Sequence, residues 1–226
     1  MGAEWRKSYQ SRWDVYDIFS KREDAPDIVW STVKNRVNFN GKIVFEMGCG
    51  TGKYTKKMAP LVKHLYANDI SETMIEKTRD TCCDYSNISY ICESADKSGL
   101  PDCSVDLIFS AWGYVAGDFE LACRVEKEFA RILKPGGEIW LVDNYYEGQF
   151  TTIRGKALKP EEDKYSEKKF GYSLVEVIPT YFLFESVEEA AGVFGFLFGD
   201  YARETIIANN IVKIEDSIAL IKKCIK

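Results

Sequence analysis

The chain of 226 residues lacks a long apolar run, an excess of basic residues and all but one histidine. Its longest apolar stretch, residues 190–198, is too short for a membrane span, which needs about 20 residues. The first residues are charged at Glu4, Arg6 and Lys7 and carry no apolar signal-peptide core. The net charge of −5 argues against a nucleic-acid backbone as the main partner. We therefore expect a globular protein with neither a membrane nor a nucleic-acid partner.

The cysteines also lack a functional spacing. All seven are irregularly placed, and Cys82 and Cys83 are adjacent, so they form neither an even disulfide framework nor a CxxC metal site. Reduced thiols of this kind are typical of cytoplasmic proteins. The sequence predicts a cytoplasmic location and no metal site.

The part of the chain with the clearest pattern is residues 43–55. Residues 43–47 are a short apolar run that predicts a buried parallel strand, and residues 53–62 carry a helical pattern. The turn between them has Gly48, Gly50 and Gly52 at alternate positions. Without a Cβ atom, each glycine can adopt positive φ and let a ligand lie against the backbone. Glu46, at the end of the strand, adds a carboxylate to the same crevice.

Two phosphate-binding motifs do not fit this turn. A P-loop has Gly, four residues and then Gly-Lys-Ser/Thr, but here Tyr54 follows Lys53 and Met47 replaces the first glycine. The dinucleotide motif G-x-G-x-x-G needs its third glycine at Lys53, and a carboxylate would face its pyrophosphate. Glu46 favours a cationic ligand instead. S-adenosylmethionine fits, because it carries an ammonium and a sulfonium but no phosphate.

Residues 46–52 resemble the first motif of the class I S-adenosylmethionine-dependent methyltransferases. A second run, residues 131–138, resembles a late motif of the same family at the expected distance from the first. The resemblance implies that Glu46 holds the amino group of the cofactor. It also implies that the backbone around the turn packs against the methionine part, through Gly48, Cys49, Gly50 and Gly52.

A second acid, Asp69, ends the next predicted strand at residues 64–69. It follows Gly52 by 17 residues, close to the spacing of about 20 at which an acid reaches ribose hydroxyls in nucleotide-binding units. The resemblance implies that Asp69 binds both ribose oxygens; the alternative role, a helix cap, is already filled by Ser71. The other cofactor residues implied by the family are Ile70, Met74 and Ala95 beside the adenine, Asp96 as acceptor for the adenine amino group, and Ser110.

The alternation of strands and helices predicts an α/β fold. The family resemblance specifies it as a three-layer, Rossmann-like sandwich with a mostly parallel seven-stranded sheet whose last strand is antiparallel. We expect one methyltransferase domain over residues 1–226. The predicted strands lie at residues 43–47, 64–69, 88–92, 105–109, 138–143 and 174–184 and within 211–225.

The N-terminal residues 1–40 are expected to form a helical cover over the cleft. An aromatic stripe in residues 5–20 predicts an amphipathic helix. Tyr9 and Trp13 in this stripe are candidate contacts for the methyl acceptor. Core packing explains the stripe equally well, and both roles are compatible.

Two further segments are expected on the acceptor side. Residues 110–117 cross the mouth of the cleft and offer Trp112 and Tyr114 as acceptor contacts. This segment lacks the Asn/Asp-Pro-Pro-Tyr motif of enzymes that methylate nucleic-acid amines, so that acceptor class is not expected. Residues 145–210 are predicted to form a variable acceptor-side cover.

Methyl transfer requires a nucleophile aligned with the sulfonium carbon, shielded from water. A hydroxyl or a protonated amine also needs a base within hydrogen-bond reach. By position alone, the candidates are Asp143, Tyr114 and Tyr145. His64 begins a strand at the end opposite the cleft, and we do not expect it to be the base.

The leading hypothesis is an S-adenosylmethionine-dependent methyltransferase that acts on a small-molecule acceptor, as a monomer or a homodimer. Two alternatives are a non-catalytic regulator that binds S-adenosylmethionine or S-adenosylhomocysteine, and an NAD-dependent oxidoreductase. No motif in the chain identifies the acceptor.

Overall fold

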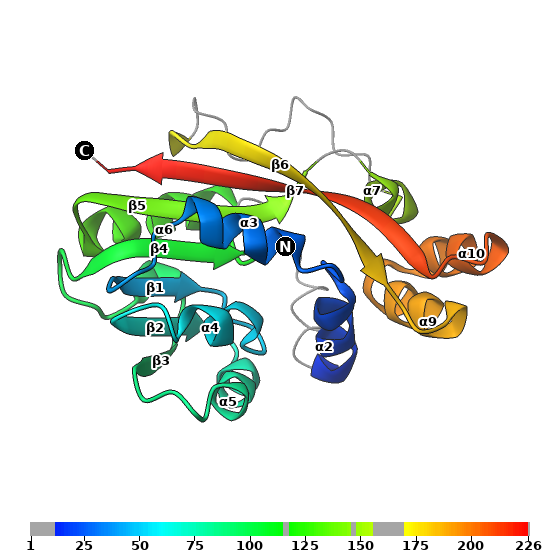
Figure 1. The fold of residues 1–226 in the computed structure, drawn as a ribbon, viewed down its shortest axis with the longest axis horizontal. Helices are drawn as coiled ribbons and strands as arrows, with labels where there is room; N and C mark the ends of the chain where they lie inside the picture. Colours follow the sequence, from blue (N-terminus) through cyan, green and yellow to red (C-terminus); the bar gives the residue numbers. More distant parts are fainter. Residues whose placement is uncertain (1–11, 115–117, 146–147, 156–169, 226) are drawn as a thin grey trace.

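The computed structural model describes residues 12–114, 118–145, 148–155 and 170–225. Its centre is a seven-stranded sheet in the order β3-β2-β1-β4-β5-β7-β6 (Figure 1). β1 to β5 pair in parallel, and β7 runs antiparallel to both β5 and β6. This topology confirms the predicted fold class. The strands are β1 (Ile43–Met47), β2 (His64–Asp69), β3 (Ile88–Cys92), β4 (Val105–Ala111), β5 (Leu133–Asn144), β6 (Ser173–Leu183) and β7 (Lys213–Cys224).

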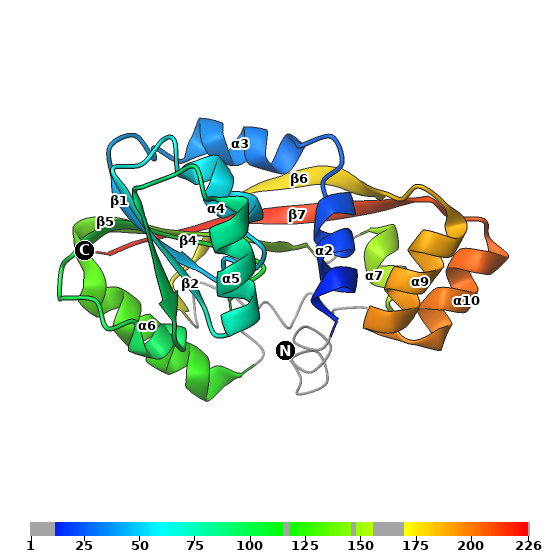
Figure 2. The same ribbon diagram turned by 90° about the horizontal axis from the view of Figure 1, so that it is seen from below.

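Helices cover both faces of the sheet. Figure 2 shows α3 and α4 on one face and α6 on the other, and α5 packs on β2 and β3. The helices are α2 (Trp13–Arg22), α3 (Ile28–Arg36), α4 (Lys53–Met58), α5 (Glu72–Thr81), η1 (Ala95–Lys97), α6 (Phe119–Ile132), α7 (Gln149–Ile153), α9 (Val187–Phe198) and α10 (Asp200–Ala208). Every helix among the described residues is too short or too polar to cross a membrane.

The two covered faces explain why β1 is apolar on both sides, apart from Glu46 near its end. Alternate side chains of a strand point to opposite faces of the sheet. In β1, Val44 packs in the cluster beneath α3, whereas Phe45 and Met47 pack in the cluster beneath α6. Both sets are buried, so a strand in this position needs an apolar run without alternation.

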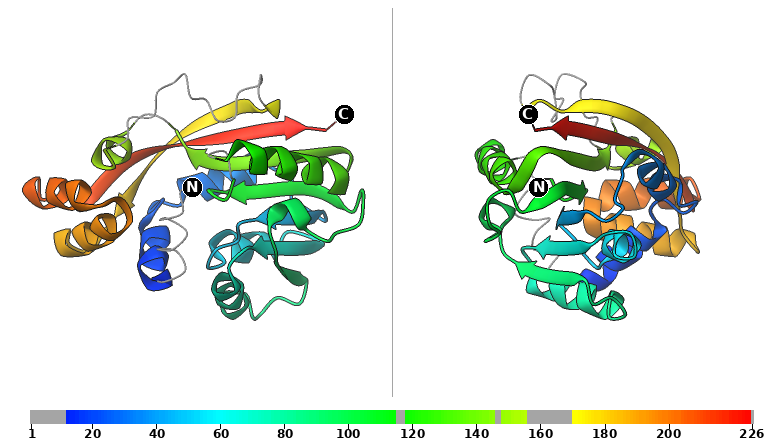
Figure 3. Two further views of the ribbon diagram at one scale, coloured as in Figure 1. Left: turned by 180° about the vertical axis from the view of Figure 1, so that it is seen from behind. Right: turned by 60° about the vertical axis from the view of Figure 1, so that its left-hand side comes forward.

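At one end of the molecule, the long strands β6 and β7 continue past the sheet and carry α9 and α10 (Figures 1 and 3). The ends of these strands pack with α2, α7, α9 and α10 in one apolar cluster. We call it the phenylalanine cluster, because its rings come from Phe19, Phe150, Phe182, Phe184, Phe194 and Phe198. It fixes α2 against a part of the chain that is more than 120 residues away in sequence.

Several element boundaries differ from the sequence-based expectation. α4 ends at Met58 rather than at residue 62, because Pro60 has no N–H to continue the helix. β5 begins at Leu133 rather than at residue 138, since Leu133 already pairs with Val105. The sequence-based prediction also omitted α7 and α10.

The second helix has a cap that the sequence pattern did not indicate. α3 begins at Ile28, two residues after Pro26. The carboxylate of Asp24 accepts hydrogen bonds from the N–H groups of Ile28 (3.0 Å) and Val29 (2.9 Å). Asp24 therefore satisfies the free donors at the start of α3.

The phenylalanine cluster generates a stability prediction. Phe182 is fully buried, with its ring centroid 4.9 Å from Phe19 and 5.1 Å from Phe150. We expect Phe182→Ala to lower the free energy of unfolding by about 3–5 kcal/mol, through lost burial and the cavity left behind. Denaturant titration measures this value. Phe119→Ala is the control, because Phe119 is 61% exposed and its loss should cost about 0.5 kcal/mol or less. Equal losses in both variants would contradict the prediction.

Candidate cofactor-binding site

The glycine-rich loop between β1 and α4 has the predicted backbone. φ is +74° at Gly48, +57° at Gly50 and +89° at Gly52, which confirms the expected positive values. Packing adds a second constraint. A Cβ atom on Gly48 would lie 2.9 Å from the Cα of Gly113, and one on Gly52 would lie 3.2 Å from the Cβ of Thr81. A side chain is therefore excluded at Gly48 by both dihedral angle and space.

Asp69, at the end of β2, fixes this loop. One carboxylate oxygen accepts a hydrogen bond from the N–H of Gly50 (3.0 Å), and the other accepts from the N–H of Ser71 (2.9 Å). A carboxylate oxygen can accept a second hydrogen bond. The predicted contact of Asp69 with the ribose hydroxyls stays a prediction, and it is compatible with these two bonds.

Glu46 is a buried acid with an unusual environment. It is 2% exposed and accepts a hydrogen bond from the hydroxyl of Thr55 (2.6 Å). Burial raises the pKa of Glu46 to about 8. No lysine or arginine among the described residues forms an ion pair with it. A bound ammonium group would stabilise the charged carboxylate, so this position suits a cationic ligand.

The predicted adenine side is formed by residues with very different exposure. Ile70 is 57% exposed, whereas Met74 and Ala95 are buried. Asp96 accepts a hydrogen bond from the guanidinium of Arg124 (2.9 Å). A hydrogen bond from Ser94 is the main reason that the pKa of Asp96 is lowered. The adenine contacts of these four residues stay predictions.

The segment after β4 closes the floor of the cleft. The hydroxyl of buried Ser110 donates to the carbonyl of Met47 (2.9 Å), which joins the end of β4 to the end of β1. A Cβ atom on Gly113 would lie 2.6 Å from the same carbonyl. Trp112 between them has φ +54°, and its indole N–H is buried without a hydrogen-bond partner among the described residues. Such a donor marks Trp112 as a candidate ligand contact.

Tyr114 does not fit either of its predicted roles, as acceptor contact or as base. Its ring is buried in the cluster beneath α6, and its hydroxyl donates to Glu126 of that helix. The hydroxyl of Tyr172 and the ammonium of Lys223 bind the same carboxylate, at 2.7 Å and 2.6 Å. Burial raises the pKa of Tyr114 above its ordinary value. This network gives Tyr114 a structural role on the α6 face.

The other two candidate bases follow β5. Asp143 lies at the tip of the strand, where a carboxylate oxygen accepts a hydrogen bond from the N–H of Asn144 (2.8 Å). Tyr145 is partly buried against the cluster beneath α6, and its N–H donates to the carbonyl of Ser217 (2.7 Å). Of the two, Asp143 has the position expected of a cleft residue, at the carboxyl end of a parallel strand.

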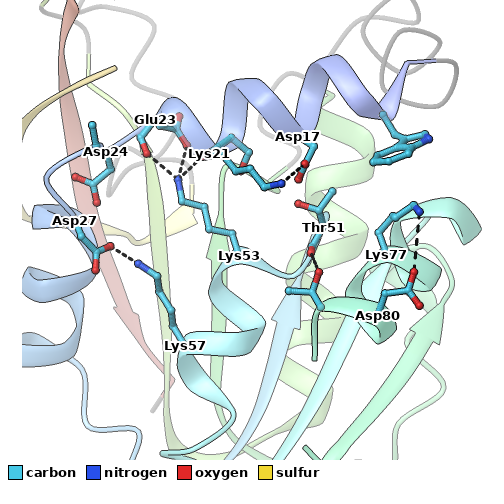
Figure 4. A pocket seen from close by; sticks show the side chains of 14 residues that line it. Asp17, Lys21, Glu23, Asp24, Asp27, Thr51, Lys53, Lys57, Lys77 and Asp80 are labelled. Carbon is cyan, nitrogen blue, oxygen red and sulfur yellow. Dashed lines mark hydrogen bonds and ion pairs between the residues drawn. The ribbon is translucent and has the colours of Figure 1, made fainter. Parts of the chain in front are cut away.

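Trp13 and Tyr9 were predicted to contact the acceptor. Tyr9 lies outside the described residues. Trp13 lines a groove of about 640 Å³ between α2 and the helices α4 and α5 (Figure 4). The ammonium of Lys77 lies 4.2 Å from the centroid of its ring. The groove contains Thr51 of the glycine-rich loop but none of the predicted cofactor residues, so it lies beside the cofactor site.

Lys53 is a site residue that the sequence analysis missed. It is the first residue of α4, directly after the glycine-rich loop. Its ammonium donates to the carbonyls of Ser20 (2.7 Å) and Glu23 (3.0 Å), at the end of α2, and lies 3.5 Å from the carboxylate of Glu23 (Figure 4). Lys53 therefore ties α2 to the cofactor loop. The place of Lys53 directly after the third glycine was a sequence signal for a site residue. The groups that Lys53 binds, however, lie at least 30 residues earlier in the chain.

The sequence analysis also missed Tyr16, in α2, and Glu23, directly after α2, as site residues. Burial raises the pKa of Glu23 to about 8, and Lys53 acts in the opposite direction. Burial also raises the pKa of Tyr16, with further contributions from the charges of Glu23 and Asp69. Tyr16 therefore lies within electrostatic reach of the ribose-side acid. Its place in the aromatic stripe was the available signal.

Comparison with known proteins agrees with this geometry. The family model described as "Methyltransferase domain" matches residues 45–141, which run from β1 into β5. Residues 45–141 of the chain thus match a methyltransferase domain, as the sequence motifs predicted. S-adenosylmethionine is the cofactor of this family, and the positive-φ glycines, the buried Glu46 without a cation and Asp69 fit its methionine and ribose parts.

Solved structures share the fold of this chain. The YcgJ protein from Bacillus subtilis is 16% identical, with 88% of this chain and 97% of that chain covered and a TM-score of 0.64. The N-methyltransferase NodS from Bradyrhizobium japonicum, in complex with S-adenosylhomocysteine, is 17% identical, with 88% and 84% covered and a TM-score of 0.53.

Sequence relatives include plant enzymes. A phosphoethanolamine N-methyltransferase from Triticum aestivum is 33% identical over 128 residues, which cover 55% of this chain and 24% of that protein. Another, from Arabidopsis thaliana, is 30% identical over 140 residues, which cover 61% of this chain and 27% of that protein. The matched part of this chain thus spans about a quarter of the length of these relatives.

The environment of Glu46 predicts a proton-linked binding step. At pH 6.5, well below its pKa of about 8, Glu46 is mostly protonated without ligand. A bound ammonium lowers this pKa, so S-adenosylhomocysteine should release close to one proton on binding. Calorimetry in two buffers with different ionisation heats measures the release. Glu46→Gln should bind more weakly and release correspondingly fewer protons; unchanged proton release in this variant would reject the assignment.

The thermal stability of Glu46→Gln is the control for its binding measurement. A raised carboxyl pKa makes the folded state bind more protons than the unfolded state between pH 4.5 and about 8, so stability is lost as the pH rises through this window. Gln has no charge to bury. Without ligand, the variant should therefore unfold at the same or a higher temperature than the natural protein at pH 8.5, which separates lost binding from lost folding.

The link between α4 and α2 gives another prediction. Lys53→Met removes the hydrogen bonds from the ammonium to the carbonyls of Ser20 and Glu23 and should cost about 2 kcal/mol of stability. It should also expose Lys21 and Arg22 of α2 to trypsin. Lys57→Met is the matched control on the same helix, because Lys57 pairs with the exposed Asp27 and should contribute about 1 kcal/mol or less. Similar trypsin sensitivity in both variants would argue against a specific link through Lys53.

Proposed function

We propose that the protein transfers the methyl group of S-adenosylmethionine to the nitrogen of a small molecule. The observation that carries the first part is Glu46, a buried carboxylate without a cation beside a glycine-rich loop. This arrangement suits a ligand whose ammonium group binds the carboxylate while the rest of the ligand packs against a backbone without side chains. The bound cofactor supplies a methyl carbon activated by the neighbouring sulfonium.

A nitrogen acceptor is supported by the relatives and by the charges beyond β5. Several relatives are named phosphoethanolamine N-methyltransferases, and one structural neighbour is an N-methyltransferase. Asp143 lies at the tip of β5, next to Trp112, whose backbone N–H donates to the carbonyl of Val142 (2.8 Å). Asp216 lies on the neighbouring strand β7 and is 3% exposed. Carboxylates at these positions attract and orient a protonated amine.

Asp216 is also a candidate base that sequence analysis did not identify. Burial raises its pKa to about 7, so it accepts a proton near neutral pH. An amine must lose a proton before it can attack the methyl carbon. Asp143 or Asp216 would take that proton, while α2, held by Lys53 and by the phenylalanine cluster, keeps water out of the cleft.

Two measurements on the full chain test this function. Calorimetry should show saturable binding of S-adenosylhomocysteine, and no binding would refute a methyltransferase. Incubation with S-adenosylmethionine and a panel of amines, phenols and thiols should yield a methylated amine, detected by mass spectrometry. Methylation of only hydroxyls or thiols would reject the nitrogen acceptor. Tight cofactor binding with no product across the panel would favour the alternative, a non-catalytic cofactor-binding regulator.

A further inference from the structure

Arg154 is a cation on the acceptor side that the proposed mechanism does not use. It directly follows α7, which the buried side chains of Phe150 and Ile153 anchor in the phenylalanine cluster. Its guanidinium carbon lies 4.8 Å from the ring centroid of Phe150 and 5.6 Å from that of Phe198. Two rings therefore restrict the side chain of Arg154, as is usual for an arginine that recognises a ligand.

The guanidinium of Arg154 has five N–H donors. It makes no hydrogen bond and no ion pair with any residue of the described ranges. The side chain is nevertheless partly buried, and burial lowers the pKa of Arg154. Donors taken out of water without acceptors cost free energy unless a ligand supplies the acceptors.

Two acids lie within electrostatic reach of Arg154, but other groups orient their carboxylates. Asp216 accepts hydrogen bonds from the side-chain amide of Asn144 (3.0 Å) and from the N–H of Ser217 (2.8 Å). Asp143 accepts from the N–H of Asn144 (2.8 Å). Both acids act on the charge of Arg154 without forming an ion pair with it. The region thus presents carboxylates and a separate guanidinium with free donors.

The distance from this region to the cofactor loop suits a small molecule. β5 is two strands away from β1 in the sheet, about 10 Å at ordinary strand spacing. Trp112 lies between these two strands. Its backbone N–H binds the carbonyl of Val142 in β5, and its neighbour Gly113 contacts Gly48. Asp143 of β5 also acts electrostatically on Arg154, so a group bound at Arg154 lies on the same side of the molecule as the tip of β5.

We propose that Arg154 binds an oxyanion group of the methyl acceptor, so that the acceptor is a small zwitterion with its amine directed toward Asp143 and its anion toward Arg154. This inference rests on the proposed nitrogen methylation and adds the chemical class of the substrate. A guanidinium pairs with a phosphate or a carboxylate through two parallel hydrogen bonds. The anion then sets the orientation of the molecule, and the amine is the end left free to react.

The first test measures binding of inorganic phosphate and of acetate to the full chain saturated with S-adenosylhomocysteine. Calorimetry on the natural protein should show saturable binding of at least one anion, and the tighter one identifies phosphate or carboxylate as the preferred group. Arg154→Gln should weaken that binding at least tenfold, and Arg154→Lys should weaken it less. Absence of saturable binding, or equal binding by Arg154→Gln, would overturn the proposal.

Arg79→Gln is the matched control, because the guanidinium of Arg79 also lies over a ring, 4.6 Å from the centroid of Tyr90, but on α5. It should bind the anion like the natural protein. All variants should retain the affinity for S-adenosylhomocysteine within about twofold. If the natural protein does not bind S-adenosylhomocysteine, the proposed function itself is rejected. If it does bind, but Arg154→Gln binds the anion as tightly as the natural protein, only the anion site is rejected.

The second test addresses the zwitterion. O-phosphoethanolamine and ethanolamine share an amine and differ by the phosphate, so their binding to the loaded protein isolates the anion. The phosphorylated molecule should bind at least tenfold tighter to the natural protein, and this preference should fall to near unity in Arg154→Gln. Equal binding of the two molecules, or binding of neither, would contradict a phosphate-bearing zwitterion.

Discussion

The cofactor site depends on one steric constraint, the contact between the backbones that leave β1 and β4. Neither Gly48 nor Gly113 has room for a Cβ atom, which would lie 2.9 Å and 2.6 Å from the opposite backbone. The hydroxyl of Ser110 bonds the carbonyl of Met47 across the same junction. With Asp69 holding the N–H of Gly50, the loop is shaped by the protein itself. A ligand then meets a preorganised surface, which lowers the entropic cost of binding.

Around this junction the protein buries acids that other proteins would leave in water. Burial raises the pKa of Glu46 and of Glu23 to about 8 and that of Asp216 to about 7. Carboxyls with raised pKa values cluster at functional sites, where a bound ligand or a reaction can use them. Their positions follow the cleft from the end of β1, beneath α2, to β7. The charge pattern of the interior therefore agrees with a cationic cofactor and an amine acceptor.

The phenylalanine cluster connects this polar cleft to the stability of the fold. It holds α2 from one side, through Phe19, while Lys53 holds the same helix from the cofactor loop. It also anchors α7 and so fixes the base of Arg154. Packing, rather than polar contacts alone, thus positions α2 and Arg154 on one rigid support. Precise placement of functional groups requires such support from the core.

The amino-acid sequence alone determined the features that depend on near neighbours. The strand, the alternate glycines and the following helix are predictable, because β-branched runs, Cβ-free turns and helix periodicity act over a few residues. The same holds for the cap of α9, where the hydroxyl of Ser186 accepts the N–H of Glu189. Together with the resemblance of residues 46–52 to a methyltransferase motif, the strand, the turn and the helix were sufficient to predict where the cofactor binds.

Only the tertiary structure decided which distant side chains meet. Tyr114 was a reasonable base by position, but its hydroxyl turns to Glu126 beneath α6. Lys53 binds the end of α2, and Arg154 stacks on Phe198 from another helix. Such pairs are separated by 12 to 44 residues and come together only when whole elements pack. Short-range sequence patterns contain no information about that packing. The sequence therefore could not predict which residues meet on the acceptor side of the cleft.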